Sequence, residues 1–130
     1  MQKSAIIREQ VLAYLAAKPG AQESFPFDTT TSVLKVGNKM FALLGYHNDS
    51  VMLNLKCPPD EVSWLCDTYS YITPGYHMNK KHWISIYFEW PDSPPDEYSL
   101  VHDLIDKSYH LIVSKLARAT KEQVLKLQST

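Results

Sequence analysis

The segment 74–83 holds the densest group of side chains that could do chemistry, with two lysines, two histidines and two aromatic residues among its ten positions. The ammonium groups of Lys80 and Lys81 could hold phosphates while the ring of Tyr76 or Trp83 stacks on a nucleobase. A second interpretation needs no ligand, because the same rings could anchor a turn to a sheet and leave the lysines exposed. Both interpretations stay open at this point.

A pocket is a further hypothesis for the same segment, because polar and aromatic groups that converge on a cleft can bind a small ligand or a protein partner. The side chains expected to line such a pocket are Tyr76, His77, Asn79, His82, Trp83 and Tyr109. Two of them, His77 and His82, could carry protons near neutral pH. No motif ties a nucleophile or a carboxylate to these histidines, so we expect a protein that is not an enzyme.

The common motifs with a defined catalytic geometry, including those that bind metals and cofactors, are absent from the sequence. It contains no P-loop, no dinucleotide-binding glycine motif, no nucleophile elbow and no zinc-protease helix motif. The spacings of His77 from His82 and of Cys57 from Cys66 differ from those of zinc knuckles and helical metal pairs. We therefore expect no metal and no cofactor, and we interpret the cysteines as buried or half-buried thiols in a reducing compartment.

Length and composition indicate one globular domain over residues 1–130, with 45% hydrophobic and 21% charged residues. The 13 basic and 14 acidic residues leave a formal net charge of −1, so no overall positive field attracts nucleic acid or an anionic membrane. Binding to either would need a local patch. No apolar run is long enough for a membrane span, and we expect a cytoplasmic protein without a membrane partner.

The N-terminal segment has the spacing of an amphipathic helix. Ile7, Val11, Tyr14 and Leu15 fall on one helical face, and Pro19-Gly20 can end the helix. This periodicity argues against a signal peptide, although basic residues precede the apolar positions.

The rest of the chain predicts a sheet with further helices. Apolar runs at 33–36 and 40–44 flank Gly37-Asn38, a pair that suits the positive backbone angles of a tight hairpin turn. We then expect, in order, a strand over 51–56 with one polar face, a helix starting near Pro58-Pro59, a strand over 83–88, a helix over about 97–117 and a short last helix with Val124 and Leu127. This order predicts an α+β domain, with helices packed on one face of an antiparallel sheet.

Short motifs run through the chain in a fixed order: Gly20-Ala21, Pro26-Phe27-Asp28, residues 34–44, Leu55-Lys56-Cys57, residues 74–83 and residues 104–109. Together they resemble the MmcQ/YjbR family. The resemblance covers the chain from about residue 20 to residue 116 and implies a frataxin-like, or CyaY-like, fold. The sequence departs from the family pattern at Asp28, where the family usually has glycine.

Members of this family are commonly labelled DNA-binding, on the basis of a proposed double-wing arrangement. Carried onto this sequence, one wing is the hairpin with Lys35 and Lys39, and the other is the loop with Lys80 and Lys81. We expect these lysines to contact phosphates, with an affinity that falls steeply with salt and with no base code. The alternative is a non-catalytic module that binds a protein or a small ligand.

A frataxin-like fold also suggests iron binding, but the residues argue against it. Frataxins crowd acidic residues into their first helix, whereas this first helix offers only Glu9, alongside Lys3, Arg8 and Lys18. Fold alone does not carry function, and we expect no iron site.

Overall fold

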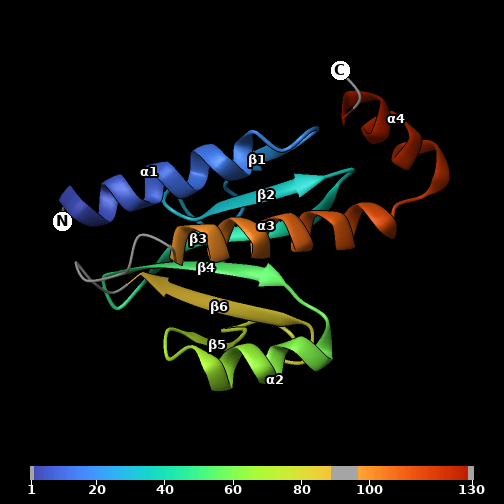
Figure 1. Cartoon of the computed structure of the whole chain (residues 1–130). Helices are drawn as coiled ribbons and strands as arrows, with labels where there is room; N and C mark the ends of the chain where they lie inside the picture. Colours follow the sequence, from blue (N-terminus) through green and yellow to red (C-terminus); the bar gives the residue numbers. More distant parts are fainter. Residues whose placement is uncertain (1, 89–96, 129–130) are drawn as a thin grey trace.

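The computed structural model describes residues 2–88 and 97–128, and these form an antiparallel sheet with helices packed against it (Figure 1). The elements in chain order are α1 (Gln2–Ala16), β1 (Gln22–Ser24), β2 (Ser32–Val36), β3 (Lys39–His47), β4 (Ser50–Lys56), α2 (Pro59–Thr68), β5 (Ile72–Pro74), β6 (Trp83–Phe88), α3 (Glu97–Ser114) and α4 (Arg118–Gln128). The strand order is β1-β2-β3-β4-β6-β5, and every neighbouring pair is antiparallel. The predicted α+β class is confirmed.

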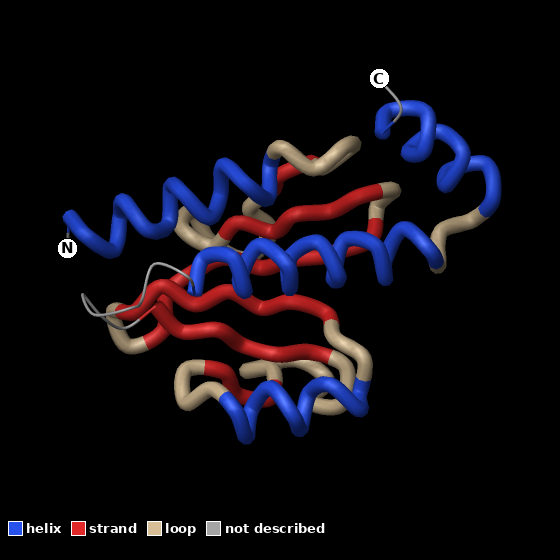
Figure 2. Tube along the Cα trace, viewed as in Figure 1, coloured by secondary structure: helices blue, strands red, loops and turns tan. Residues whose placement is uncertain are grey.

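Helices α1 and α3 lie across one face of the sheet, while α2 packs beside β5 and β6 at one edge (Figure 2). The face under α1 and α3 carries the alternate strand positions Leu44, Leu53 and Ile86, which are fully buried. We call the opposite face of the sheet the open face. No helix in the described part of the chain is long and apolar enough to cross a membrane.

The hairpin between β2 and β3 turns at Gly37-Asn38, as the sequence predicts. Both residues have positive φ, 55° and 68°, which is the backbone geometry of a tight two-residue turn. Position 37 also has no room for a side chain, because a Cβ there would lie 2.7 Å from a methyl group of Leu116 and 2.8 Å from one of Thr120. The end of the hairpin is therefore held against the segment that joins α3 to α4 and against the first turn of α4.

Helix α3 is fixed to the sheet by a buried hydroxyl. Ser108 Oγ donates to the carbonyl of Phe41 at 2.6 Å and accepts the backbone N–H of Lys56 at 2.9 Å. The next residue, Tyr109, packs edge-on against Phe41 and donates its hydroxyl to the carbonyl of Pro19 at 2.6 Å. This pair joins α3 to two strands and to the turn that follows α1.

A polar contact joins α1 to α3 on the same side. Tyr14 donates its hydroxyl to Asp106 at 2.8 Å, its ring stacks on His102 at 3.8 Å, and the Lys18 ammonium pairs with Asp106. Partial burial raises the pKa of Asp106, but the hydrogen bonds from Lys18 and Tyr14 outweigh it, so the pKa lies below its usual range. The carboxylate therefore stabilises the folded state in its charged form.

One feature of β4 differs from the prediction of a polar, half-buried face. Met52 is 6% exposed and Asn54 is 1% exposed, because the loop after β5 folds over this part of the open face. Short strands were also missed. All three side chains of β1 are exposed and β5 ends in Pro74, so neither has the alternating apolar pattern that predicts a strand.

Candidate functional site

The loop between β5 and β6, residues 75–82, forms a compact turn. Gly75 donates its N–H to the carbonyl of Trp83 at 2.8 Å, and the N–H of Met78 bonds back to the carbonyl of Gly75. A Cβ at Gly75 would lie 2.7 Å from that of Trp83, so only glycine fits this close approach. His77 takes a positive φ of 57°, which reverses the chain within the loop.

The open face holds this loop through two buried polar side chains. Ser85 donates to Asn54 Oδ1 at 2.5 Å and accepts the N–H of Tyr76 at 2.8 Å, while Asn54 Nδ2 donates to the carbonyl of Tyr76 at 3.3 Å. Asn54 and Ser85 are directly opposite each other on β4 and β6. The backbone of Tyr76 is therefore fixed from both strands, and its ring is left at the surface.

Several predicted pocket residues serve the loop itself. Asn79 accepts the N–H of Lys81 at 3.0 Å, and the carbonyl of His82 accepts the N–H of Cys57 at 2.8 Å. The Trp83 backbone pairs with Lys56 in the sheet. Tyr109 belongs to α3, on the side of the sheet away from the open face, so the structure does not bring it to the loop.

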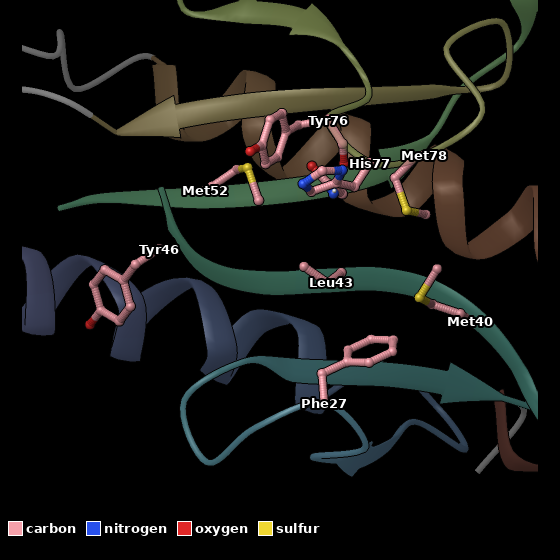
Figure 3. A pocket seen from close by; sticks show the side chains of 9 residues that line it. Phe27, Met40, Leu43, Tyr46, Met52, Tyr76, His77 and Met78 are labelled. Atoms are coloured by element: carbon pink, nitrogen blue, oxygen red, sulfur yellow. Dashed lines mark hydrogen bonds between the residues drawn. The ribbon is translucent and has the colours of Figure 1, made fainter. Parts of the chain in front are cut away.

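A hollow of about 410 Å³ lies between the loop and the open face (Figure 3). Of the predicted pocket residues, Tyr76 and His77 line it. The full lining consists of Phe27, Met40, Leu43, Tyr46, Met52, Asn54, Tyr76, His77 and Met78. We call this site the open-face hollow. Met40, Met52 and Leu43 could not be assigned to it from sequence, because they reach it only through the register of β3 with β4, whereas Met78 lies in the loop beside His77.

The rim of the hollow carries neighbouring aromatic rings. The ring of Tyr76 lies 4.3 Å from the ring of His47 and 4.0 Å from that of His77, between centroids. The side chain of Tyr76 is 36% exposed and that of Phe27 is 71% exposed. These surfaces are available for stacking or apolar contact with a ligand.

Six lysines lie in elements and loops at the end of the sheet where the β2–β3 hairpin turns. Figure 1 shows this end of the sheet on the right. Lys35 and Lys39 lie in the hairpin, and Lys80 and Lys81 lie in the loop that enters β6 at this same end. The other two members are Lys56 and Lys115, at the last position of β4 and just after α3. We call these six residues the lysine end.

Lys56 and Lys115 face each other across the boundary between sheet and helix. Partial burial lowers the pKa of Lys56, and the neighbouring charge of Lys115 lowers it further. Sequence reasoning missed this pair, because the two residues are far apart in the chain and belong to different elements. Two ammonium groups at close range favour an anion between them.

The predicted wing lysines share an end of the sheet, but they have different surroundings. Lys35 pairs with Met40 beside the open-face hollow, and Lys39 is exposed at the turn. The ammonium group of Lys80 donates a hydrogen bond to the carbonyl of Gly75 at 3.1 Å. Lys80 and Lys81 also line a hollow against α2 that contains Asp67.

None of the ion pairs in the described part of the chain involves a residue of the lysine end. They join Lys18 to Asp106, Lys107 to Glu61 and Arg118 to Glu122. Within the same described residues, no group of three or more histidine, cysteine or acidic side chains could hold a metal ion. The site chemistry is therefore that of ammonium groups beside an apolar, aromatic hollow.

Comparison with known proteins shows which family the chain belongs to. The model of the YjbR family matches residues 16–111. The chain belongs to the YjbR family. It is 38% identical to YbdF of Escherichia coli O157:H7 over 82% of this chain and 84% of that protein, and 30% identical to YjbR of Escherichia coli K12 over 91% and 97%. It is also 32% identical to YyaQ of Bacillus subtilis over 82% and 98%.

Solved structures of similar proteins share the fold. The crystal structure of Deinococcus radiodurans protein DR2400 aligns with a TM-score of 0.77 at 31% identity, covering 89% of this chain and 86% of that one. A crystal structure of a Pseudomonas syringae protein aligns with a TM-score of 0.65 at 28% identity, over 81% and 97%. The resemblance to the YjbR family that the sequence motifs carry is thus confirmed.

The departure from the family pattern at Asp28 has a local explanation in this YjbR-family protein. Asp28 Oδ1 accepts the backbone N–H groups of Thr30 and Thr31, at 2.8 and 2.6 Å. These bonds lower the pKa of Asp28. The side chain therefore stabilises the turn that leads into β2, as aspartate commonly does in loops.

Proposed function

We propose that this YjbR-family protein is a non-catalytic nucleic-acid-binding module that holds phosphates at its lysine end. The observation that carries the proposal is the closeness of Lys56 and Lys115, with the four wing lysines at the same end of the sheet. Ammonium groups placed together cost free energy unless an anion or solvent screens them. A phosphate backbone supplies such anions at regular spacing.

The whole-protein charge makes a local patch necessary for this function. With a formal net charge of −1, attraction to nucleic acid depends on where the basic groups lie. The lysine end holds six of the basic residues, and none of the ion pairs among the described residues involves them. Lysines act on phosphate as point charges, so we expect affinity without a base code.

The test is fluorescence anisotropy of labelled duplex DNA, single-stranded DNA and RNA at about 50 mM salt. Two charge-removing double variants are compared with the wild type, Lys80→Gln with Lys81→Gln and Lys56→Gln with Lys115→Gln. The matched control, Gln10→Glu with Ala13→Glu, changes net charge by the same amount at two exposed positions of α1. Circular dichroism checks that each variant is folded.

The proposal expects each lysine variant to weaken binding at least about threefold, and the control to weaken it much less, because phosphate contacts are local. Equal losses in all three double variants would show that only net charge matters and would reject the lysine end as the site. Absence of binding to all three nucleic acids by the wild type at low salt would reject the function itself.

A further inference from the structure

The open-face hollow is built from two kinds of apolar surface. Met40, Met52 and Met78 bring thioether groups from β3, β4 and the loop, and Phe27 and Tyr76 bring rings from opposite sides (Figure 3). Thioether sulfur makes favourable contacts with aromatic rings, and methionine adapts its shape to what it contacts. Rings also pack well against the edge or face of another ring. The lining therefore suits an aromatic occupant.

A buried amide adds one directional group to this apolar lining. Asn54 is 1% exposed, lines the hollow, and uses one amide hydrogen on the carbonyl of Tyr76. Its oxygen accepts from Ser85, which fixes which end of the amide carries the hydrogens. None of the hydrogen bonds among the described residues uses its second amide hydrogen, and buried donors strongly favour a partner.

The size of the hollow and its exposed rim indicate a small-molecule site. A volume of about 410 Å³ lies within the range of cavities that hold small ligands. Phe27 at the rim is 71% exposed, an unusual state for such a large apolar side chain beside a concave surface. A ligand in the hollow would remove from water this ring and the side chains of Met40 and Met78, which are partly exposed, whereas Met52 is already buried.

From these features we infer that the open-face hollow binds a planar aromatic small molecule that carries a hydrogen-bond acceptor. The ring system lies among the three methionines, Phe27 and Tyr76, and the acceptor takes the free amide hydrogen of Asn54. The site is separate from the lysine end in its chemistry, because it needs no charge on the ligand. It therefore stands whether or not the protein binds nucleic acid.

The test compares two aromatic probes of similar size by NMR titration of the ¹⁵N-labelled full chain. Quinoline carries a ring nitrogen that accepts a hydrogen bond, whereas indole offers a donor in its place. We expect quinoline to shift the amide signals of residues that line the hollow, with a dissociation constant of about 1 mM, which is typical of a fragment. Indole should bind about threefold to tenfold more weakly, the effect of one hydrogen bond.

Two pairs of variants locate the site. Leu43→Trp places a bulky ring in the hollow and should abolish quinoline binding, while Thr73→Trp places the same ring on β5, outside the lining. Phe27→Ala should weaken binding several-fold, while Phe25→Ala removes a similar exposed ring that does not line the hollow. The NMR spectrum of each variant shows whether the fold is kept.

The inference is overturned if quinoline shifts signals elsewhere, or if a folded Leu43→Trp variant binds it as the wild type does. Equal affinity for quinoline and indole would reject the role of Asn54 as the donor. If Leu43→Trp does not fold, the Phe27→Ala and Phe25→Ala pair decides, because both positions are exposed and tolerate truncation.

Discussion

Removing the Asn54 side chain should release the loop 75–82 and destabilise the protein. Asn54→Ala removes two hydrogen bonds, to Ser85 and to the carbonyl of Tyr76, and leaves the buried Ser85 hydroxyl short of an acceptor. Each lost bond costs about 1 kcal/mol net, and a buried unsatisfied group costs about 1–3 kcal/mol. We expect a loss of about 2–4 kcal/mol in the free energy of unfolding.

The assay is urea denaturation followed by tryptophan fluorescence, with hydrogen exchange of the Tyr76 amide as a local probe. That amide donates to Ser85 Oγ, so it should exchange faster in Asn54→Ala. Asn79→Ala is the matched control, because this asparagine is exposed and its side chain accepts a hydrogen bond from Lys81 within the loop, and it should cost about 1 kcal/mol or less.

A double-variant cycle with Ser85→Ala isolates the contact between the two side chains. The combined variant should lose less than the sum of the single losses, by about 1 kcal/mol, since either substitution alone already breaks the shared bond. An Asn54→Ala protein that unfolds within about 0.5 kcal/mol of the wild type, with unchanged exchange at Tyr76, would refute the account of how the loop is held.

Three further predictions concern the hairpin, the lysine end and the helix contact. Gly37→Ala should destabilise by more than about 1 kcal/mol in urea denaturation, because the residue has positive φ and the new Cβ would press on Leu116. Lys115→Gln should raise the pKa of Lys56, measured by NMR of the side chain, because burial and the Lys115 charge together lower it. Asp106→Asn should flatten the loss of stability in acid. Folding lowers the pKa of Asp106, so the charged carboxylate stabilises the folded state at pH values above the usual pKa of aspartate. This stabilisation is lost as the pH falls through the lowered pKa of the folded state.

Each of these has a clear contrary result. A Gly37→Ala protein as stable as the wild type would show that the turn accepts a side chain. An unchanged Lys56 pKa in Lys115→Gln would place the two ammonium groups apart and remove the main support for the lysine end. Equal acid sensitivity of Asp106→Asn and the wild type would mean that the ion pair with Lys18 contributes no stability.

The fold could be predicted where local pattern and tertiary structure agree. Gly37-Asn38 between two apolar runs predicts the hairpin, since few other dipeptides accept two positive φ values. The apolar stripe over 97–117 predicts α3, whose buried residues include Ile105 and Ile112. These signals depend only on neighbours in the sequence, so they are readable without the fold.

The site was harder to predict, because its parts come from distant segments. The polar Asn54 suggested a solvent-facing strand, yet its burial follows from a loop more than twenty residues later. Tyr109 belongs to another motif of the same family, at 104–109, and the sheet lies between it and the loop. Motif membership gives no information about which face of a sheet a residue occupies.

The lysine end shows the same division between local and distant information. The wing lysines were predicted because they flank recognisable turns, at Gly37-Asn38 and in the loop 75–82. Lys56 and Lys115 were not, because only the packing of α3 on β4 brings them together. A basic patch formed from several elements leaves no charge run in the sequence.

The most direct test of nucleic-acid binding is the salt dependence of affinity for duplex DNA, measured by anisotropy between about 50 and 200 mM salt. Six lysines set an upper limit of about 5 on the slope of log K against log salt, at about 0.9 per phosphate contacted. The account predicts a slope between about −2 and −5, reduced by up to about 2 units when Lys80 and Lys81 are both changed to glutamine. A slope near zero, or binding that ignores the loss of these lysines, would contradict it.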